Sequence, residues 1–325
     1  MKKLLSLCLC TFLGLTLLTG CGSKDKELPH IGVVQIVEHK SLNIIRDSFK
    51  DEMAKLGYVD GENCIIDFEN AGGEPTNANS IVTKFKGDNV DVIVAIATPT
   101  AQAAATASKD IPVIFSAVTD PIASGLTSSL EKPDKNITGT SDEIQVDQIL
   151  DFALTIQPDA KTMGVIYNAS ETNSVTNINK AKKYAKEHNL KVEEVSVVNV
   201  TDMQSAAQVL CEKVDFIFTP NDNTVASGMT VLSDIAKKAK VPVYTGADSM
   251  VMDGGFASVG IDYEDLGRET ARMTVEVLKG TNVKDLPVKV FKTDLKTFIN
   301  KTTAKELGIT IPEEILNAES TRLFD

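Results

Sequence analysis

Five short polar segments each follow an apolar run of strand length, and they carry the recognition chemistry of this chain. They supply hydroxyls, amides and a few carboxylates, and none of them contains lysine or arginine. Hydroxyls and the free N–H groups of helix starts can hold a carboxylate, and an aspartate can hold an ammonium group. Together these groups would suit a small zwitterion. The segments are residues 98–100, 119–121, 168–174, 221–224 and 246–249.

Each polar segment also has a purely structural interpretation. Thr98 is a good N-cap and Pro99 fits the first position of a helix, so their segment could serve capping alone. Asn, Asp, Ser and Gly dominate ordinary turns, so any one segment could be a turn. Their repetition on one side of both predicted sheets favours binding. Asp120 and Asp248 are then the expected ammonium partners, whereas Asp222 is expected to complement a helix dipole.

The elements that would position these segments alternate between strand and helix, and the pattern runs twice along the chain. Strands interleaved with helices indicate parallel sheets covered on both faces, which predicts an α/β fold with two similar lobes. Ligands of such sheets bind beyond the carboxyl ends of the strands. The predicted strands are 31–37, 64–68, 90–97, 111–118, 163–167, 192–198, 216–218, 241–244 and 256–260, and the main predicted helices are 41–56, 101–107, 175–187 and 265–279.

The N-terminus resembles a bacterial lipoprotein signal. Lys2 and Lys3 precede an apolar run over residues 4–18, and Leu-Thr-Gly-Cys follows at 18–21. A basic start, an apolar segment and small residues at a cleavage point describe an export signal. We expect residues 1–20 to be removed, Cys21 to be lipidated and residues 21–29 to form a tether outside the cytoplasmic membrane, at the cell surface in a Gram-positive organism. An ordinary signal peptide or a single membrane anchor are the alternatives, although the run is short for a span of ~20 residues.

Composition excludes several other classes of function. The 325-residue chain has a formal net charge of −12, and loss of the signal would remove two further lysines. Such acidity argues against nucleic acid, which needs basic patches. Cys64 and Cys211 are expected to be buried free thiols. Without a Cys-x-x-Cys pair or a Cys/His cluster, neither a metal nor another cofactor is expected.

The polar segments and their neighbours resemble the ABC transporter substrate-binding lipoproteins for aromatic amino acids, including the clostridial surface lipoproteins that take tyrosine. The similarity covers essentially the whole mature chain. It implies a type I two-lobe periplasmic-binding-protein fold with a hinge of three crossovers, an aromatic amino acid as ligand (tyrosine first, then tryptophan or phenylalanine) and a membrane permease as partner. The motifs that carry it are residues 35–39, 97–102, 116–121, 138–142, 165–168, 222–227, 260–263 and 266–268.

The chain departs from the family pattern at a few positions. Residues 39–43 read His-Lys-Ser-Leu-Asn where the family often has His-Pro-Ala-Leu-Asp, Gln145 stands where proline is frequent, and Asn221 stands where threonine is frequent. The first and third changes alter polarity near the expected cleft, so they bear on the ligand more than on the fold.

The resemblance also places the lobes, which would be discontinuous in sequence. The crossovers are expected near 139–143, 261–265 and 290–293. The N-terminal lobe would then comprise residues 30–140 plus 265–290, and the C-terminal lobe residues 141–264 plus 291–325. Residues 138–142 are expected to act as a hinge, because small and polar residues absorb backbone rotation; a surface loop is the alternative.

The expected mechanism is capture of the ligand by closure of the two lobes, which shifts the population toward the closed form. Cleft walls would include His39, Val118 and Tyr167, whereas Phe115 is expected to pack in the core. The expected ligand-binding residues are Gln35, His39, Thr98, Pro99, Thr100, Ser116, Ala117, Val118, Thr119, Asp120, Asn168, Glu171, Asn173, Ser174, Asn221, Asn223, Thr224 and Asp248.

Three rival functions remain open at this point. An enzyme is disfavoured because the chain has no Gly-x-Ser-x-Gly elbow and no histidine in a recognisable nucleophile arrangement. A surface adhesin that contacts host cells is compatible with the tether and could coexist with ligand binding. A sensor that passes its closed form to a signalling receptor is also compatible with the sequence.

Overall fold

The first lobe is built on a six-stranded sheet in which every pairing is parallel. The computed structural model describes residues 28–293 and 295–325. The strand order is β11-β5-β4-β3-β1-β2. Buried apolar runs such as β3, which is buried along its whole length, make the centre of this sheet. The strands are β1 (His30–Gln35), β2 (Ile65–Asn70), β3 (Val92–Ile96), β4 (Val113–Ser116), β5 (Ile137–Ser141) and β11 (Lys289–Val290).

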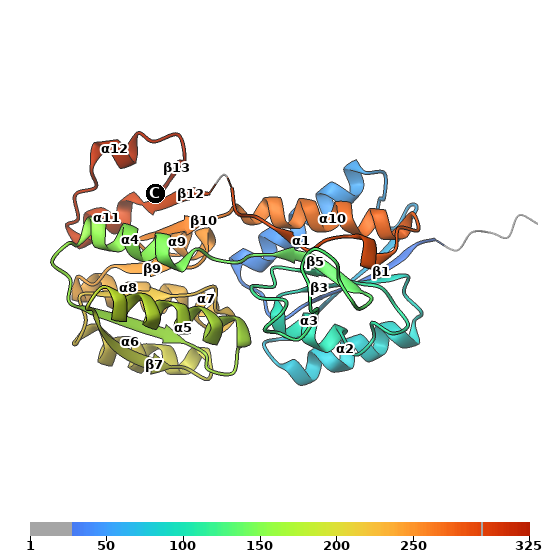
Figure 1. The fold of residues 1–325 in the computed structure, drawn as a ribbon, viewed down its shortest axis with the longest axis horizontal. Helices are drawn as coiled ribbons and strands as arrows, with labels where there is room; N and C mark the ends of the chain where they lie inside the picture. Colours follow the sequence, from blue (N-terminus) through green and yellow to red (C-terminus); the bar gives the residue numbers. More distant parts are fainter. Residues whose placement is uncertain (1–27, 294) are drawn as a thin grey trace, which may run out of the picture.

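Four helices cover the two faces of this sheet. Helices α1 (Lys40–Lys55) and α10 (Tyr263–Leu278) pack side by side on one face, and α2 (Pro75–Gly87) and α3 (Thr98–Ala104) pack together on the other (Figure 1). Helix α1 buries Leu42, Ile45, Phe49 and Met53, a stripe at helical spacing that the sequence pattern predicted. Phe115 in β4 lies fully buried in the same core, as predicted.

The second lobe is built on a seven-stranded sheet of order β13-β12-β10-β9-β8-β6-β7. All pairings are parallel except that between β10 and β12, which is antiparallel. The strands are β6 (Thr162–Tyr167), β7 (Lys191–Ser196), β8 (Phe216–Thr219), β9 (Val243–Thr245), β10 (Ala257–Gly260), β12 (Lys296–Asn300) and β13 (Thr321–Phe324). The helices are α4 (Val146–Ile156), α5 (Thr172–Glu187), α6 (Met203–Cys211), α7 (Asn223–Ser227), α8 (Met229–Ala239), α9 (Asp248–Met252), α11 (Lys301–Leu307) and α12 (Glu313–Leu316).

An aromatic cluster fixes the core of the second lobe. The buried ring of Tyr244 meets Phe152, Phe216 and Phe256 edge to face, with ring centroids 5.4–6.3 Å apart. Edge-to-face pairs add to the stabilisation from area burial. Tyr167 belongs to this core too and donates a hydrogen bond to Glu194 at 2.6 Å. Tyr167 therefore packs in the core of the second lobe and not in the cleft wall, where we expected it.

Three segments connect the two lobes (Figure 1). They run between β5 and α4, between β10 and α10, and between β11 and β12. Residues 138–141 form part of β5 within the first sheet, so of the polar run 138–142 predicted as a hinge only Asp142 lies in the connection itself. The polar side chains of this strand are satisfied internally. Thr138 donates to the carbonyl of Leu286 at 2.9 Å, and Thr140 lies 3.1 Å from the hydroxyl of Thr270.

The other predicted elements are present with boundaries that shift by a few residues. Thr98 is the first residue of α3 rather than its N-cap, and its hydroxyl caps nothing. Asp222 is the N-cap of α7 and accepts a hydrogen bond from the Val225 N–H at 2.8 Å, as predicted. Over the described residues, each helix is too short or too polar to span a bilayer. The lipidation predicted at Cys21 lies outside the described residues.

Close packing of α1 against α10 depends on one glycine, and this yields a stability prediction. A Cβ on Gly267 would lie 2.4 Å from the Ile45 carbonyl oxygen, a backbone atom that cannot move away. We expect Gly267→Ala to lower the free energy of unfolding by about 1–3 kcal/mol, measured in urea. Gly87→Ala is the matched control, because it also lies in a helix but meets open space. It should be neutral or gain up to about 1 kcal/mol. Equal effects of the two changes would contradict this account of the helix pair.

Candidate ligand-binding site

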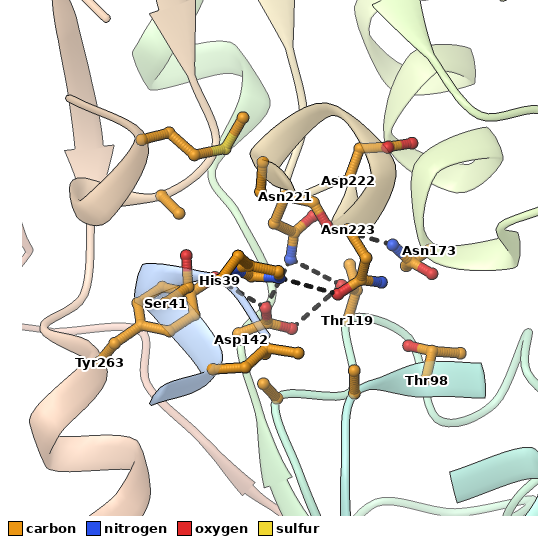
Figure 2. Close-up of a pocket in the computed structure, with 16 residues that line it drawn as sticks. His39, Ser41, Thr98, Thr119, Asp142, Asn173, Asn221, Asp222, Asn223 and Tyr263 are labelled. Atoms are coloured by element: carbon orange, nitrogen blue, oxygen red, sulfur yellow. Dashed lines mark hydrogen bonds between the residues drawn. The ribbon is translucent and has the colours of Figure 1, made fainter. Parts of the chain in front are cut away.

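A small cavity lies between the lobes, beyond the carboxyl ends of β1, β3, β4, β8 and β9. Its volume is about 20 Å³, which is room for about one water molecule. Figure 2 shows side chains converging on this cavity from both lobes. It is lined by His39, Ser41, Leu42, Ala97, Thr98, Ala117, Thr119, Asp142, Asn173, Asn221, Asp222, Asn223, Ala226, Ala247, Met250 and Tyr263.

His39 precedes α1 and offers a hydrogen-bond acceptor to the cavity. Burial lowers the pKa of His39 to about 4, so its ring is neutral at physiological pH. The Asn223 amide nitrogen donates to Glu171, which leaves its oxygen facing the His39 Nε2 at 3.3 Å. Nε2 must therefore carry the proton and donate. The other ring nitrogen, Nδ1, is buried without a hydrogen-bond partner and presents a lone pair.

Two alanines in strained conformations shape the first-lobe wall. Ala97 follows β3 with φ +84° and ψ 158°, and Ala117 follows β4 with φ +55°. Non-glycine residues rarely adopt positive φ, and such strain gathers at functional sites. Thr98 follows directly, and its buried hydroxyl has no hydrogen-bond partner. In the second lobe, the buried Asn173 side-chain oxygen is also unpaired. Unpaired polar atoms from both lobes thus line one cavity.

Asp142 is a buried carboxylate at the start of the first connecting segment. It accepts hydrogen bonds from Thr119 at 3.0 Å, from Asn221 at 2.6 Å and from the Tyr263 hydroxyl at 2.9 Å. Its described hydrogen-bond partners are all neutral, and burial raises its pKa above the usual value. Asn221 belongs to the second lobe, and Tyr263 begins α10 of the first lobe just after the second connecting segment, so groups from both lobes meet at this carboxylate.

Two more buried carboxylates belong to the second-lobe wall, where Asp222 lines the inner cavity and Glu171 the outer groove. Glu171 accepts from the N–H groups of Asn223 and Thr224, both at 3.1 Å, and Asp222 accepts from the Asn168 N–H at 2.6 Å. Burial raises the pKa of both acids, and the charge of Asp222 raises that of Glu171 further. Among the residues that the structure describes, no lysine or arginine lines the cavity. The site is therefore an electron-rich pocket suited to a cation.

Asp248 begins α9 and is also buried, with 4% of its surface exposed. Burial raises its pKa to about 7, and the charges of Asp262 and Glu264 act in the same direction. Its carboxylate accepts from the Ser249 N–H at 2.7 Å. It lies next to the lining residue Ala247 but is not itself a lining residue.

A larger groove of about 560 Å³ opens between the lobes beside this cavity, and Asn223 lines both. Of the predicted binding residues, His39, Thr98, Ala117, Thr119, Asn173, Asn221 and Asn223 line the inner cavity. Pro99, Asn168, Glu171 and Thr224 line the outer groove. Eleven of the eighteen predicted residues thus line one of these two adjoining interlobe spaces.

Seven predicted residues line neither space, and the described contacts explain why. Asp120 accepts from the N–H groups of Ile122 and Ala123, so it stabilises its own turn. The Thr100 hydroxyl donates to carbonyls of its own helix start. The others are Gln35, bonded to Asn43; Ser116, within 3.3 Å of Thr140; Val118, in the first core; Ser174, bonded to Asp222; and Asp248.

Sequence reasoning missed several residues that line the cavity. Asp142 and Tyr263 lie in motifs that carry the family resemblance, but the sequence assigns Asp142 only to the expected hinge and Tyr263 to no binding role. Ser41 and Leu42 lie in the segment that departs from the family pattern, and Met250 directly follows the last polar segment, but none of the three is among the expected binding residues. The signal that could have found Asp142 is a carboxylate directly after a strand of the first sheet, the same pattern that singled out Asp120.

The described residues hold no group of three or more His, Cys, Asp or Glu side chains arranged to bind a metal. Cys64 is a buried free thiol and Cys211 is a partly buried one. Burial raises the pKa of both thiols. Neither cysteine lines the cavity.

Two α/β lobes joined by three segments around a polar cleft define the class of two-lobed solute-binding proteins. More distant solute-binding proteins share the fold; one at 14% identity superposes with a TM-score of 0.63. Residues 30–322 match the family described as ABC transporter substrate binding protein, and the chain belongs to that family. The fold class predicted from the sequence is confirmed. The protein is accordingly an extracytoplasmic binding protein rather than an enzyme.

Three relatives illustrate the similarity. The tyrosine-binding protein of Clostridioides difficile (strain R20291) is 40% identical over 95% of this chain and 93% of its own. The ABC domain in complex with L-Trp from Streptococcus pneumonia is 41% identical, covers 91% of this chain and all of its own, and has a TM-score of 0.87. A ligand-free, open substrate-binding protein with adhesive properties from Clostridium difficile is 40% identical, covers 92% and 99% of the two chains, and has a TM-score of 0.69.

The raised pKa of Asp248 predicts how stability depends on pH. The carboxyl group of Asp248 binds its proton more tightly in the folded state than in the unfolded state. Its contribution to the free energy of unfolding is therefore fully present below about pH 4. It is lost as the pH rises through about 7. We expect the free energy of unfolding to fall by about 2–4 kcal/mol between about pH 5 and pH 8, and Asp248→Asn to reduce that fall. Denaturant titrations at both pH values measure this. Asp120→Asn, at a half-exposed turn, is the control, and an identical slope in both variants would contradict the prediction.

Proposed function

We propose that the protein captures an aromatic amino acid between its lobes and presents it to the permease of an ABC importer. Tyrosine is the favoured ligand, followed by tryptophan or phenylalanine. The observation that carries the proposal is the buried carboxylate of Asp142 in a cavity without a cationic side chain. A buried carboxylate with neutral partners is costly, and a ligand ammonium group would compensate it.

The ammonium group of the ligand would lie against the acceptors of the cavity. Asp142 supplies the charge, while the unpaired His39 Nδ1 and Asn173 oxygen supply lone pairs from opposite lobes. A group with three N–H donors matches this set better than a carboxylate or a sugar hydroxyl would. Asp248 lies behind the wall and would add longer-range attraction.

The carboxylate of the ligand would face the first-lobe wall. Thr98 offers an unpaired hydroxyl there, at the start of α3. The first N–H groups of a helix have no partner within the helix, and they favour negative charge. The strained conformations of Ala97 and Ala117 bring the backbone close to this wall.

The aromatic side chain would contact the apolar part of the lining. Leu42 and Met250 lie on opposite lobes of the inner cavity, and the outer groove adds further apolar surface. Burying one ring contributes about 1.5–3 kcal/mol. The flexible methionine suits ligands of slightly different shape, which supports a preference within the aromatic class rather than absolute selection.

Closure of the lobes is the proposed mode of capture. At nearly equal identity, the chain superposes better on the L-Trp complex (TM-score 0.87) than on the ligand-free, open relative (0.69). That difference supports two lobe arrangements in the family, of which this structure resembles the ligand-bound one. A ligand that contacts both lobes would shift the population toward the closed arrangement.

We also propose that the protein is anchored in the membrane by a lipid on Cys21. The basic start, the apolar run and the cysteine at the cleavage point support it. Cys21→Ser should move the protein from the membrane fraction to the medium, as followed by immunoblotting. Retention of Cys21→Ser in membranes would point to a different anchor.

Adhesion to host cells is a second candidate function. It is favoured by one observation, the adhesive properties of a relative 40% identical to this chain. An Asp142→Ala variant that no longer binds amino acids but still adheres to host cells would separate the two roles. Loss of both properties together in a folded variant would count against independent adhesion.

The ligand class can be tested by thermal shift with the twenty amino acids. A ligand that binds only the folded state raises its stability by RT ln(1 + [L]/Kd), about 2.7 kcal/mol at a hundredfold excess over Kd. We expect tyrosine to raise the melting temperature by several degrees, with tryptophan or phenylalanine next. A flat response to all three, beside a rise with sugars, would reject the ligand class.

The ammonium partner can be tested by Asp142→Asn. This change keeps the shape and most hydrogen bonds of Asp142 but removes its charge, so tyrosine affinity should fall about 10- to 100-fold by calorimetry. Asp91→Asn, at the solvent-exposed edge of the first lobe, is the control. Unchanged affinity in Asp142→Asn would exclude this carboxylate as the ammonium site.

A further inference from the structure

Three consecutive residues at the start of α1 each bond to the opposite lobe. His39 contacts Asn223, Lys40 forms an ion pair with Asp253 at 2.6 Å, and Ser41 shares a short hydrogen bond with Ser249. Lys40 is the first residue of α1 in the first lobe, and Asp253 directly follows α9 in the second. These bonds exist only while the two lobes are together.

One of these three contacts, the Lys40–Asp253 ion pair, lies away from the binding site, whereas His39, Ser41 and Asn223 line the inner cavity. Lys40 and Asp253 line neither the inner cavity nor the outer groove, so a ligand there would not touch them. Their side chains are 42% and 26% exposed. Ser41 and Ser249 are both more than nine-tenths buried. A partly exposed ion pair and a buried hydrogen bond, made by adjacent residues of α1, therefore both cross the lobe interface.

We propose that the Lys40–Asp253 and Ser41–Ser249 pairs form an interlobe latch that sets ligand affinity, and that its ion pair does so without contacting the ligand. The inference rests on the proposed function, because it concerns the affinity of the same cleft. Bonds made only in the closed arrangement raise the fraction of binding-competent protein. Observed affinity scales with that fraction, so the latch strengthens binding of every ligand by the same factor.

The ion pair is the cleaner half of the latch to test. Exposed ion pairs contribute modestly, so Lys40→Ala or Asp253→Ala should weaken binding of L-tyrosine about two- to fivefold. The same factor should apply to L-tryptophan and L-phenylalanine, and the loss should appear as faster dissociation. A residue that touched the ligand would instead change the ratio among the three. The difference from wild type should shrink at about 1 M salt.

A double-mutant cycle and a charge swap distinguish pairing from two separate effects. If the residues act together, the double alanine variant should bind no more weakly than either single variant. Lys40→Asp with Asp253→Lys should recover affinity relative to Lys40→Asp alone. Lys50→Ala is the matched control, because it lies on the same helix and removes an ion pair with Asp60 inside one lobe. Additive losses, or a similar loss in Lys50→Ala, would overturn the latch.

The buried half of the latch predicts a larger effect. Ser249→Ala leaves the buried Ser41 hydroxyl without its partner, so affinity should fall about fivefold or more. Ser41→Ala with Ser249→Ala removes both hydroxyls, and part of the loss should be recovered. An equal or greater loss in the double variant would contradict the buried pair.

Chemical cross-linking tests the latch and the proposed ligand class separately. A carbodiimide can join a lysine and a carboxylate in direct contact as an amide. Mass spectrometry of wild type should find the Lys40–Asp253 cross-link, with a yield that rises with L-tyrosine. If the cross-link forms but amino acids neither bind nor change its yield, the ligand class is wrong and the contact stands. If amino acids bind but no cross-link forms at saturation, the latch is wrong.

Discussion

The structure is organised around buried negative charge that the described protein does not neutralise. Asp142, Glu171, Asp222 and Asp248 all lie within or just behind the interlobe walls, and their hydrogen-bond partners in the described structure are neutral groups. Hydrogen bonds from amides and hydroxyls make this burial tolerable but do not remove its cost. The same carboxylates would attract a positively charged group and repel an anion. Under the proposed function, the buried charge that would attract the ligand is therefore also the charge that lowers the stability of the fold. The amides and hydroxyls around these carboxylates hold them in place.

In this fold, one of the buried carboxylates is held by groups from both lobes. Asp142 starts one connecting segment, and Tyr263, which donates to it, begins α10 just after another. Asn221 reaches Asp142 from the second lobe and also donates to Thr119 of the first. A change in lobe orientation must rearrange these bonds. Under the proposed function, these direct contacts would couple occupancy of the cavity to the orientation of the lobes.

Much of this arrangement follows from local sequence patterns, and the rest does not. The sequence predicts the strands β1, β3 and β6 because each is a continuous apolar run, as expected for a strand buried on both faces. It predicts the helix α1 because apolar residues recur at helical spacing along one face. The strand β5 is not predictable in this way, because its threonines are typical of a loop. Their side chains form hydrogen bonds only with distant residues, such as Thr270 and Leu286. Asp142 was overlooked for the same reason: its neighbours come from segments about 80 and 120 residues away. The site residues that sequence did find were those following a predictable strand.

The order of strands in the first sheet has a consequence for how the molecule is made. Its edge strand β11 and its covering helix α10 come after the entire second sheet except β12 and β13. During synthesis, nearly the whole chain must therefore be made before the first lobe can be completed. Neither half corresponds to a contiguous stretch, so truncation or proteolytic nicking would not release one half intact. Assembly must be a joint event of the whole chain, which suits a polypeptide that acquires its shape only after crossing a membrane.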